Sequence, residues 1–239
     1  MRNMMLWDTS SSSLLFCAVT DKVSIVLRHD FSKKALCSEI PEVFNNIMKI
    51  TEELPANMDI YVGIGPGSFT SVKTGNAFFL SWLYSRGVTK IKTFSSHQIS
   101  LMLPETSKDG FYFTITPFNR NRFFISSFKI KRDTILKYEQ DICVSHEELK
   151  NKAKKINSSC VTVIMTEDIP EETDSIFEKF FSEVHRIKGF KTLDPRAVER
   201  LETKEKNIVS EPMLLNYIVQ PAGLFSKNEY KFYTPFIPK

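Results

Sequence analysis

Residues 63–70 read Gly-Ile-Gly-Pro-Gly-Ser-Phe-Thr, and they hold three of the eight glycines in the chain. The stretch begins within a short apolar run, residues 59–64, that is typical of a buried parallel strand. It leads into residues 69–86, which have a helical pattern and are followed by Gly87 in a position to end the helix. When a chain with few glycines places several of them together, the backbone there needs conformations that residues with a side chain do not readily adopt. We therefore expect Gly65 and Gly67 to adopt such backbone conformations.

Two interpretations of this glycine turn are open. A strand, a glycine turn and a helix start together direct free N–H groups outward, where they can bind an anion. However, no Lys follows Gly67 as a P-loop requires, and neither G-x-G-x-x-G nor G-x-S-x-G is completed. A structural turn is therefore favoured, and an anion site is the alternative. The residues concerned are Gly65, Pro66, Gly67 and Ser68.

Working outward, hydrophobic periodicity predicts the same order of elements in both halves of the chain: three strands, then helix, strand, helix, strand and helix. In the first half we expect strands at residues 4–8, 14–19, 23–28, 59–64 and 91–94, and helices at 38–54 (capped by Ser38), 69–86 and 95–103. In the second half we expect strands at 111–116, 122–131, 134–139, 160–165 and 184–187, and helices at 145–155, 171–182 and 195–205.

This repeated order predicts an α/β protein with two lobes, each a mixed sheet with an antiparallel edge and a parallel centre. The duplicated ribonuclease-H-like architecture of actin-like proteins and sugar kinases has this order, βββαβαβα. The polar, turn-rich residues 104–110 make the best boundary. We therefore expect lobes at residues 1–106 and 107–239, with a tail that is free to pack back on the first lobe.

Asp8 is a second candidate site residue, because it ends the first predicted strand and precedes Thr9 and Ser10. In nucleotide-binding proteins of the actin-like class, an Asp at this place orients a hydrated metal ion, and the hairpin after it cradles phosphate. That hairpin relies on glycine for close approach, whereas residues 10–13 are all serine. An Asp that caps the turn is therefore slightly favoured over nucleotide binding.

Length and composition indicate an ordinary globular protein. The 239 residues include 32 Lys and Arg against 28 Asp and Glu, and 42% are hydrophobic. The longest apolar run, residues 14–19, is far shorter than the ~20 residues of a membrane span. The four cysteines form no C-x-x-C pair and the four histidines no H-x-x-x-H pair. We therefore expect a cytoplasmic protein with free thiols, no metal site and no membrane contact.

Charge is segregated in the second half of the chain. Residues 119–155 carry ten basic against five acidic side chains, and residues 167–183 carry seven acidic against one basic. Two solvated faces are the favoured interpretation. Contact with RNA or with an acidic partner surface is the alternative.

Several short segments together resemble the TsaB family, also called YeaZ. The family's pattern is a strand ending in D-T-S, then G-x-G-P-G-S-F-T-G-L-R-x-G, then S-S. In this chain the matching segments are Leu6-Trp-Asp8-Thr-Ser10, residues 63–70, Val72-Lys73-x-Gly75 and Ser95-Ser96. There are two departures: Ser71, Val72 and Lys73 replace G-L-R, and Cys37 stands where the family usually has histidine.

The resemblance implies a non-catalytic partner of TsaD, which transfers a threonylcarbamoyl group to the adenosine next to the anticodon of certain tRNAs. It also implies a TsaE-like ATPase as a further partner, a homodimer when the chain is alone, and contact with tRNA through the complex. We expect no strongly bound cofactor on this chain, with ATP and Mg²⁺ acting at the level of the complex. An older family label, M22 peptidase, has no metal or nucleophile constellation here to support it.

The partner surface is expected on the two long helices of the first lobe, because each is more apolar than one buried face requires. TsaB-like proteins use these two helices to pair with themselves or with TsaD. Trp82 is expected to be a central anchor of this surface. The expected interface residues are Val43, Ile47, Ile50, Lys73, Ala77, Phe78 and Trp82.

Two other functions are open at this point. The first is an ATP-dependent phosphotransferase or carbamoyltransferase of the actin-like fold, which would use Asp8 and residues 63–70. The second is an RNA-binding module, which would use the basic residues of the segment 119–155.

Overall fold

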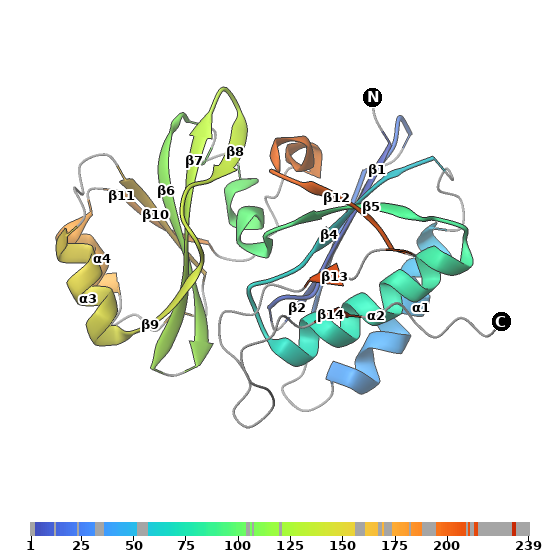
Figure 1. Cartoon of the computed structure of the whole chain (residues 1–239), viewed down its shortest axis with the longest axis horizontal. Helices are drawn as coiled ribbons and strands as arrows, with labels where there is room; N and C mark the ends of the chain where they lie inside the picture. Colours follow the sequence, from blue (N-terminus) through green and yellow to red (C-terminus); the bar gives the residue numbers. More distant parts are fainter. Residues whose placement is uncertain are drawn as a thin grey trace. The chain divides into compact units, whose positions relative to one another are not determined.

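The computed structural model describes residues 3–11, 13–22, 24–31, 36–51, 57–103, 106, 108–119, 121–155, 161–166, 169, 174–181, 183–187, 195–208, 210, 213–214 and 231–232. The chain divides into two compact units (Figure 1): Met1–Ser96 with Thr203–Lys239, and His97–Glu202. The predicted boundary after residue 106 is therefore wrong. The chain enters the second unit at His97 and leaves it after Glu202.

The first unit contains a six-stranded sheet in the order β12-β5-β4-β1-β2-β3. Its strands are β1 (Met4–Asp8), β2 (Ser13–Val19), β3 (Ser24–Asp30), β4 (Asp59–Gly63), β5 (Lys90–Phe94) and β12 (Lys204–Asn207). The β1–β2 and β2–β3 pairs are antiparallel, whereas β4 runs parallel to β1 and β5. Helices α1 (Leu36–Thr51) and α2 (Phe69–Ser85) lie side by side on one face of this sheet (Figure 1). The predicted mixed sheet of this lobe is confirmed.

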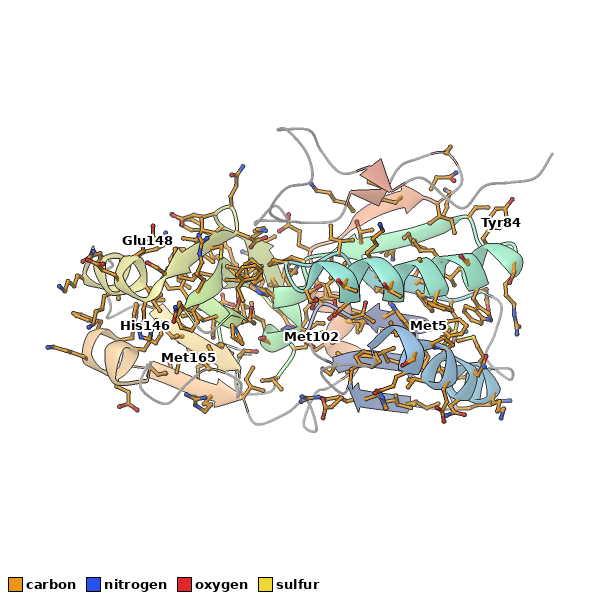
Figure 2. The ribbon with its side chains drawn as sticks, turned by 90° about the horizontal axis from the view of Figure 1, so that it is seen from below. Met5, Tyr84, Met102, His146, Glu148 and Met165 are labelled. Carbon is orange, nitrogen blue, oxygen red and sulfur yellow. The ribbon has the colours of Figure 1, made fainter. Side chains whose placement is uncertain are left out.

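The core of the first unit forms because both helices turn apolar stripes toward the sheet. Met5 of β1 belongs to this core (Figure 2). Trp7 of β1 stacks on Phe79 of α2, with ring centroids 4.6 Å apart and planes 3° apart. On α1 the buried residues recur at helical spacing: Ile40, Val43, Phe44 and Ile47.

Helix α2 has a capping signal at both ends, and of the two only the C-terminal one, Gly87, was predicted from the sequence. Ser68 is its N-cap, and Ser68 Oγ accepts a hydrogen bond from Ser71 N. Gly87 follows the C-cap with φ of +74°, a left-handed conformation that glycine adopts without strain. Helix α1 differs from the prediction, because it begins at Leu36 and so contains Ser38 rather than being capped by it.

The second unit contains a sheet in the order β11-β10-β6-β7-β8, with β9 also paired to β7. Helices α3 (His146–Lys155) and α4 (Asp174–Phe180) lie together on one face (Figure 1), over a core that includes Ile125 and Val163. The strands are β6 (Gly110–Asn119), β7 (Arg122–Lys131), β8 (Thr134–Lys137), β9 (Ile142–Ser145), β10 (Val161–Thr166) and β11 (Glu183–Ile187), and the short helices are η1 (Ser96–Leu101) and η5 (Pro195–Arg200). A separate pair joins β13 (Met213–Leu214) to β14 (Lys231–Phe232). The predicted α/β class with two mixed sheets is confirmed.

The structure differs from the prediction at two places in the second half. Strand β9 was not expected, because its four residues directly precede α3 and carry no strand-length pattern of their own. The helix expected at 195–205 ends at Arg200, and β12 follows, antiparallel to β5 of the first unit. Thr93 Oγ1 donates a hydrogen bond to Lys204 O across this pair at 3.1 Å. A segment assigned to the second lobe thus completes the sheet of the first.

None of the described helices combines the length and the apolar character needed to cross a membrane.

Candidate functional site

The end of β1 packs against glycines that come from two other segments. Each residue of the Asp-Thr-Ser sequence at 8–10 faces one glycine at a distance that no larger residue permits. A Cβ on Gly63 would lie 1.9 Å from Asp8 Oδ1, one on Gly75 would lie 2.4 Å from Thr9 Oγ1, and one on Gly67 would lie 2.0 Å from Ser10 O. The two sequence motifs are therefore the two sides of one packed junction.

Asp8 is enclosed at the centre of this junction, with a relative exposure of 4%. Ser10 donates to Oδ2 from its amide at 3.2 Å and from its hydroxyl at 2.7 Å. Ser96 Oγ, at the start of η1, donates to Oδ1 at 2.5 Å. Burial raises the pKa of Asp8 above its ordinary value, and the hydrogen bonds from Ser96 and Ser10 oppose this rise.

The glycine turn is tied to the same two neighbours. Gly65 N donates to Ser96 Oγ at 2.9 Å, and Ser96 N donates back to Gly65 O at 2.9 Å. Ser68 N donates to Ser10 O at 2.8 Å. Gly65 has φ of +92° and precedes Pro66 through a cis peptide bond. The turn, the β1–β2 hairpin and the start of η1 thus form a single hydrogen-bonded unit.

This geometry favours the structural interpretation of the turn. The Gly65 and Ser68 amides, which an anion would need, already have acceptors within the protein, and Pro66 has no N–H to offer. The Asp8 carboxylate accepts three hydrogen bonds and is buried, as a turn-capping carboxylate would be. Among the described residues, no cluster of three or more His, Cys, Asp or Glu could hold a metal ion.

Asn76 of α2 also belongs to the junction, and it is not among the site residues predicted from the sequence. Asn76 Nδ2 donates to Gly63 O at 3.0 Å, which links α2 to the end of β4. The signal was a polar residue on an otherwise apolar stripe. Thr9 Oγ1 and Asn76 Oδ1 are buried without a hydrogen-bond partner among the described residues. Ser96 was noted in the sequence as part of a motif, but its bond to Asp8 was not foreseen.

The expected partner interface is corrected in part. Val43 and Ile47 have exposures of 8% and 0% and belong to the core of the first unit, so they cannot form a surface. The side chain of Ile50 lies outside the described residues. Lys73 is exposed and Ala77 is half-buried on α2.

Phe78 is the exposed aromatic residue that the interface prediction requires, with 37% of its surface accessible. Trp82 is half-buried, and its ring lies 6.1 Å from that of Phe44. The Arg86 guanidinium lies over the Trp82 ring at 5.3 Å. Tyr84 is 40% exposed near the C-terminal end of α2 (Figure 2). Phe78, Trp82 and Arg86 recur every four residues and form one side of the helix, which we call the aromatic face of α2, whereas Tyr84 lies on the other flank of the buried stripe.

The two mixed sheets with their flanking helices have the two-lobed α/β fold that the sequence predicts, with ribonuclease-H-like lobes. No protein-family model and no curated protein sequence matches the chain. Solved structures do match it. A protein of Bacteroides thetaiotaomicron with an actin-like ATPase fold is 10% identical to this chain, with a TM-score of 0.44. The superposition covers 82% of this chain and 95% of that protein.

Two better superpositions are with proteins connected with YeaZ from Pseudomonas aeruginosa. An uncharacterized protein with similarity to peptidase YeaZ has a TM-score of 0.60 and covers 83% of this chain and 90% of its own. YeaZ itself has a TM-score of 0.59, and the superposition covers 84% of this chain and 90% of YeaZ. Both are 10% identical to this chain. The resemblance noted in the sequence is thereby confirmed at the level of the fold.

Proposed function

We propose that this chain is a non-catalytic subunit that supports a TsaD-like protein in making N6-threonylcarbamoyladenosine in tRNA. The closed junction is the observation that carries the proposal. Phosphate binding by the glycine turn would need backbone N–H groups that are free to face the anion. Here Ser68 N bonds Ser10 O at 2.8 Å, and Gly67 leaves no space beside that carbonyl group. The glycine turn and the Asp-Thr-Ser sequence thus hold the first unit together, and in this proposal the TsaD-like partner catalyses the threonylcarbamoyl transfer.

The aromatic face of α2 supports the second half of the proposal. An α/β lobe buries one stripe of each helix, and the exposed Phe78 lies outside that stripe, next to Trp82 on the same side of α2. An exposed aromatic residue beside a partly buried Trp is typical of protein interfaces, where such residues act as anchors. We infer that this face binds the TsaD-like protein, or a second copy of the chain when it is alone. A TsaE-like ATPase, ATP and Mg²⁺ belong to the assembled cytoplasmic complex, which reaches tRNA.

The proposal is tested by co-purification with the TsaD-like protein of the same organism, followed by a threonylcarbamoyl transfer assay with and without this chain. Phe78→Glu places a charge on the aromatic face and should abolish association and transfer while leaving the circular dichroism spectrum unchanged. Phe118→Glu is the matched control, because Phe118 is 38% exposed but lies in the second unit. It should retain both activities.

The opposite results would overturn the proposal. Transfer that proceeds equally well without this chain would remove the supporting role. Association that survives Phe78→Glu would move the interface elsewhere. Tight binding of ATP·Mg²⁺ by the isolated chain would favour a phosphotransferase or carbamoyltransferase.

A further inference from the structure

A cluster of aromatic and basic side chains lies on the second unit's sheet, on the same face as the core that α3 and α4 cover but farther along β6 and β7 and on β8. Strand register places its members on one face, because Lys129 of β7 is opposite Phe111 of β6 and Leu136 of β8. Tyr138 N donates to Ser127 O, so Tyr138 continues the same row two residues after Leu136. We call these residues the aromatic–lysine patch: Phe111, Lys129, Lys131, Leu136 and Tyr138.

The patch is preorganised rather than a random scatter of side chains. The Phe111 and Tyr138 rings meet edge to face, with centroids 5.1 Å apart and planes at 74°. Lys129 Nζ lies 4.9 Å from the centre of the Phe111 ring, a cation–π contact that holds the ammonium group in place. Tyr138 is 59% exposed and Leu136 is 40% exposed, so a flat apolar surface faces solvent beside fixed positive charge.

Three of the carboxylates near the patch along the chain have cationic partners, and a fourth, Asp109, accepts a hydrogen bond from Arg132 N at 2.9 Å. Asp133 pairs with Arg200 at 2.8 Å, Glu139 pairs with Lys152 at 3.8 Å, and Asp141 pairs with Lys137. Lys131 has no ion pair among the described residues and is exposed. Among the described residues the two lysines of the patch therefore form no ion pair, and they lie near the exposed Tyr138 side chain.

We propose that the aromatic–lysine patch binds single-stranded nucleic acid. A base would stack on the exposed Tyr138 ring, and the backbone phosphates would pair with Lys129 and Lys131. An acidic peptide would satisfy the lysines but would have no use for an open aromatic face, so the combination favours nucleic acid. The inference stands on the second unit alone and does not depend on the proposed partnership through the first unit.

The test is fluorescence anisotropy of a ten-nucleotide, mixed-sequence, single-stranded RNA with the full chain, titrated at several salt concentrations. Tyr138→Ala should weaken binding about tenfold or more, because a stacked base is lost. Tyr138→Phe should bind as the natural chain does. Lys129→Gln with Lys131→Gln should lower the slope of log affinity against log salt by about 1.4, since each lost contact with a single strand removes about 0.7.

Matched variants separate the patch from general charge and general apolarity. Lys150→Gln with Lys154→Gln removes the same two charges from exposed positions of α3 and should leave the slope unchanged. Phe118→Ala removes a 38% exposed aromatic from the opposite face of the same sheet and should not weaken binding. The same oligonucleotide as DNA shows whether the 2′-hydroxyl contributes.

Three outcomes would overturn the proposal. The first is that the natural chain does not bind the oligonucleotide at low salt. The second is that Tyr138→Ala and the Lys129→Gln, Lys131→Gln double variant bind no more weakly than their controls. The third is that poly-glutamate displaces the labelled RNA as effectively as unlabelled RNA does, which would identify an acidic protein segment as the partner. None of these readouts involves the TsaD-like protein, so failure here leaves the proposed function intact.

Discussion

Gly65 and Gly67 lie in the same turn but are constrained in different ways. Gly65 has φ of +92°, a conformation that side-chain-bearing residues rarely adopt. Gly67 has no such angle, and the expectation of an unusual backbone conformation is wrong for it. Its constraint is the Ser10 carbonyl oxygen, which would lie 2.0 Å from a Cβ. Gly65 is therefore required by its backbone angle, and Gly67 by the lack of space for a side chain.

Gly67→Ala should lower the free energy of unfolding by about 1–3 kcal/mol, because the added methyl group meets backbone atoms that cannot rotate away. Gly110→Ala is the matched control, since its Cβ would find its nearest neighbour at 3.7 Å, an ordinary contact. Urea unfolding of both variants measures the difference. Equal losses would refute the packing argument. An unchanged Gly67→Ala transition with lost partner-dependent transfer would identify the turn as a binding site instead.

Asp8 predicts a pH dependence of stability. Its pKa is raised in the folded protein by burial, so the folded state holds the proton that the unfolded state releases above the ordinary pKa of 3.8. The natural chain should therefore lose stability relative to Asp8→Asn as the pH rises from about 4 toward neutral, with a slope of up to about 1.4 kcal/mol per pH unit. Urea unfolding of both proteins at several pH values gives the difference. A difference that is flat, or that grows with pH, would contradict the raised pKa.

At the scale of elements, His97 connects η1 to strands β6 and β7 in the second unit. Its Nδ1 lies 2.5 Å from Ser126 Oγ, and its Nε2 lies 2.8 Å from Thr116 Oγ1. Ser126 donates its own proton to Asp141, which also pairs with Lys137. The Ser126 oxygen must then accept from Nδ1–H, and Nε2 accepts from Thr116. This chain of hydrogen bonds requires a neutral imidazole.

Burial lowers the pKa of His97 to about 4, opposed by the negative charge of Asp141 and assisted by Lys137. The folded state therefore binds fewer protons than the unfolded state below the ordinary pKa of 6.5. The stability of the natural chain relative to His97→Gln should be constant above pH 6.5 and fall by about 3 kcal/mol as the pH drops to 4. Denaturant unfolding across this range checks it. No pH dependence in the difference would mean that the buried imidazole does not resist protonation.

At the scale of the whole molecule, the connectivity of the two units is asymmetric. The second unit is one continuous segment, His97–Glu202, with its own core. The first unit needs the chain to return, because β12 completes its sheet beside β5 and Ile208 joins its core. A sheet that lacks an edge strand exposes unpaired backbone groups and apolar surface.

Residues 97–202 expressed alone should therefore unfold in one cooperative transition, whereas residues 1–96 should be insoluble or only partly folded. Joining residue 96 to residue 203 by a short glycine–serine linker should rescue the first unit, because Thr93 and Lys204 are paired across β5 and β12. Circular dichroism melts and sedimentation of the three proteins test this. A stable, monomeric 1–96 fragment would show that the return of the chain is dispensable.

Local patterns in the sequence were sufficient to determine the class of the fold. Alternating or continuous apolar runs predicted β1, β2, β4 and β7, and a helical pattern followed by Gly87 predicted α2, since these depend on residues close in the chain. The strand–glycine turn–helix unit and the importance of Asp8 were also readable. Glycines and a polar residue at a strand end report directly on backbone geometry.

Tertiary structure alone decided what those residues do. Asp8 and Ser96 are 88 positions apart, and no local pattern predicts that one donates to the other. The same applies to the return of β12 and to the burial of Val43 and Ile47, which looked like surplus apolar residues on a helix. Periodicity shows that a helix has an apolar side, but the width of that side is set by what packs against it. Those neighbours come from distant segments, which only the folded chain brings together.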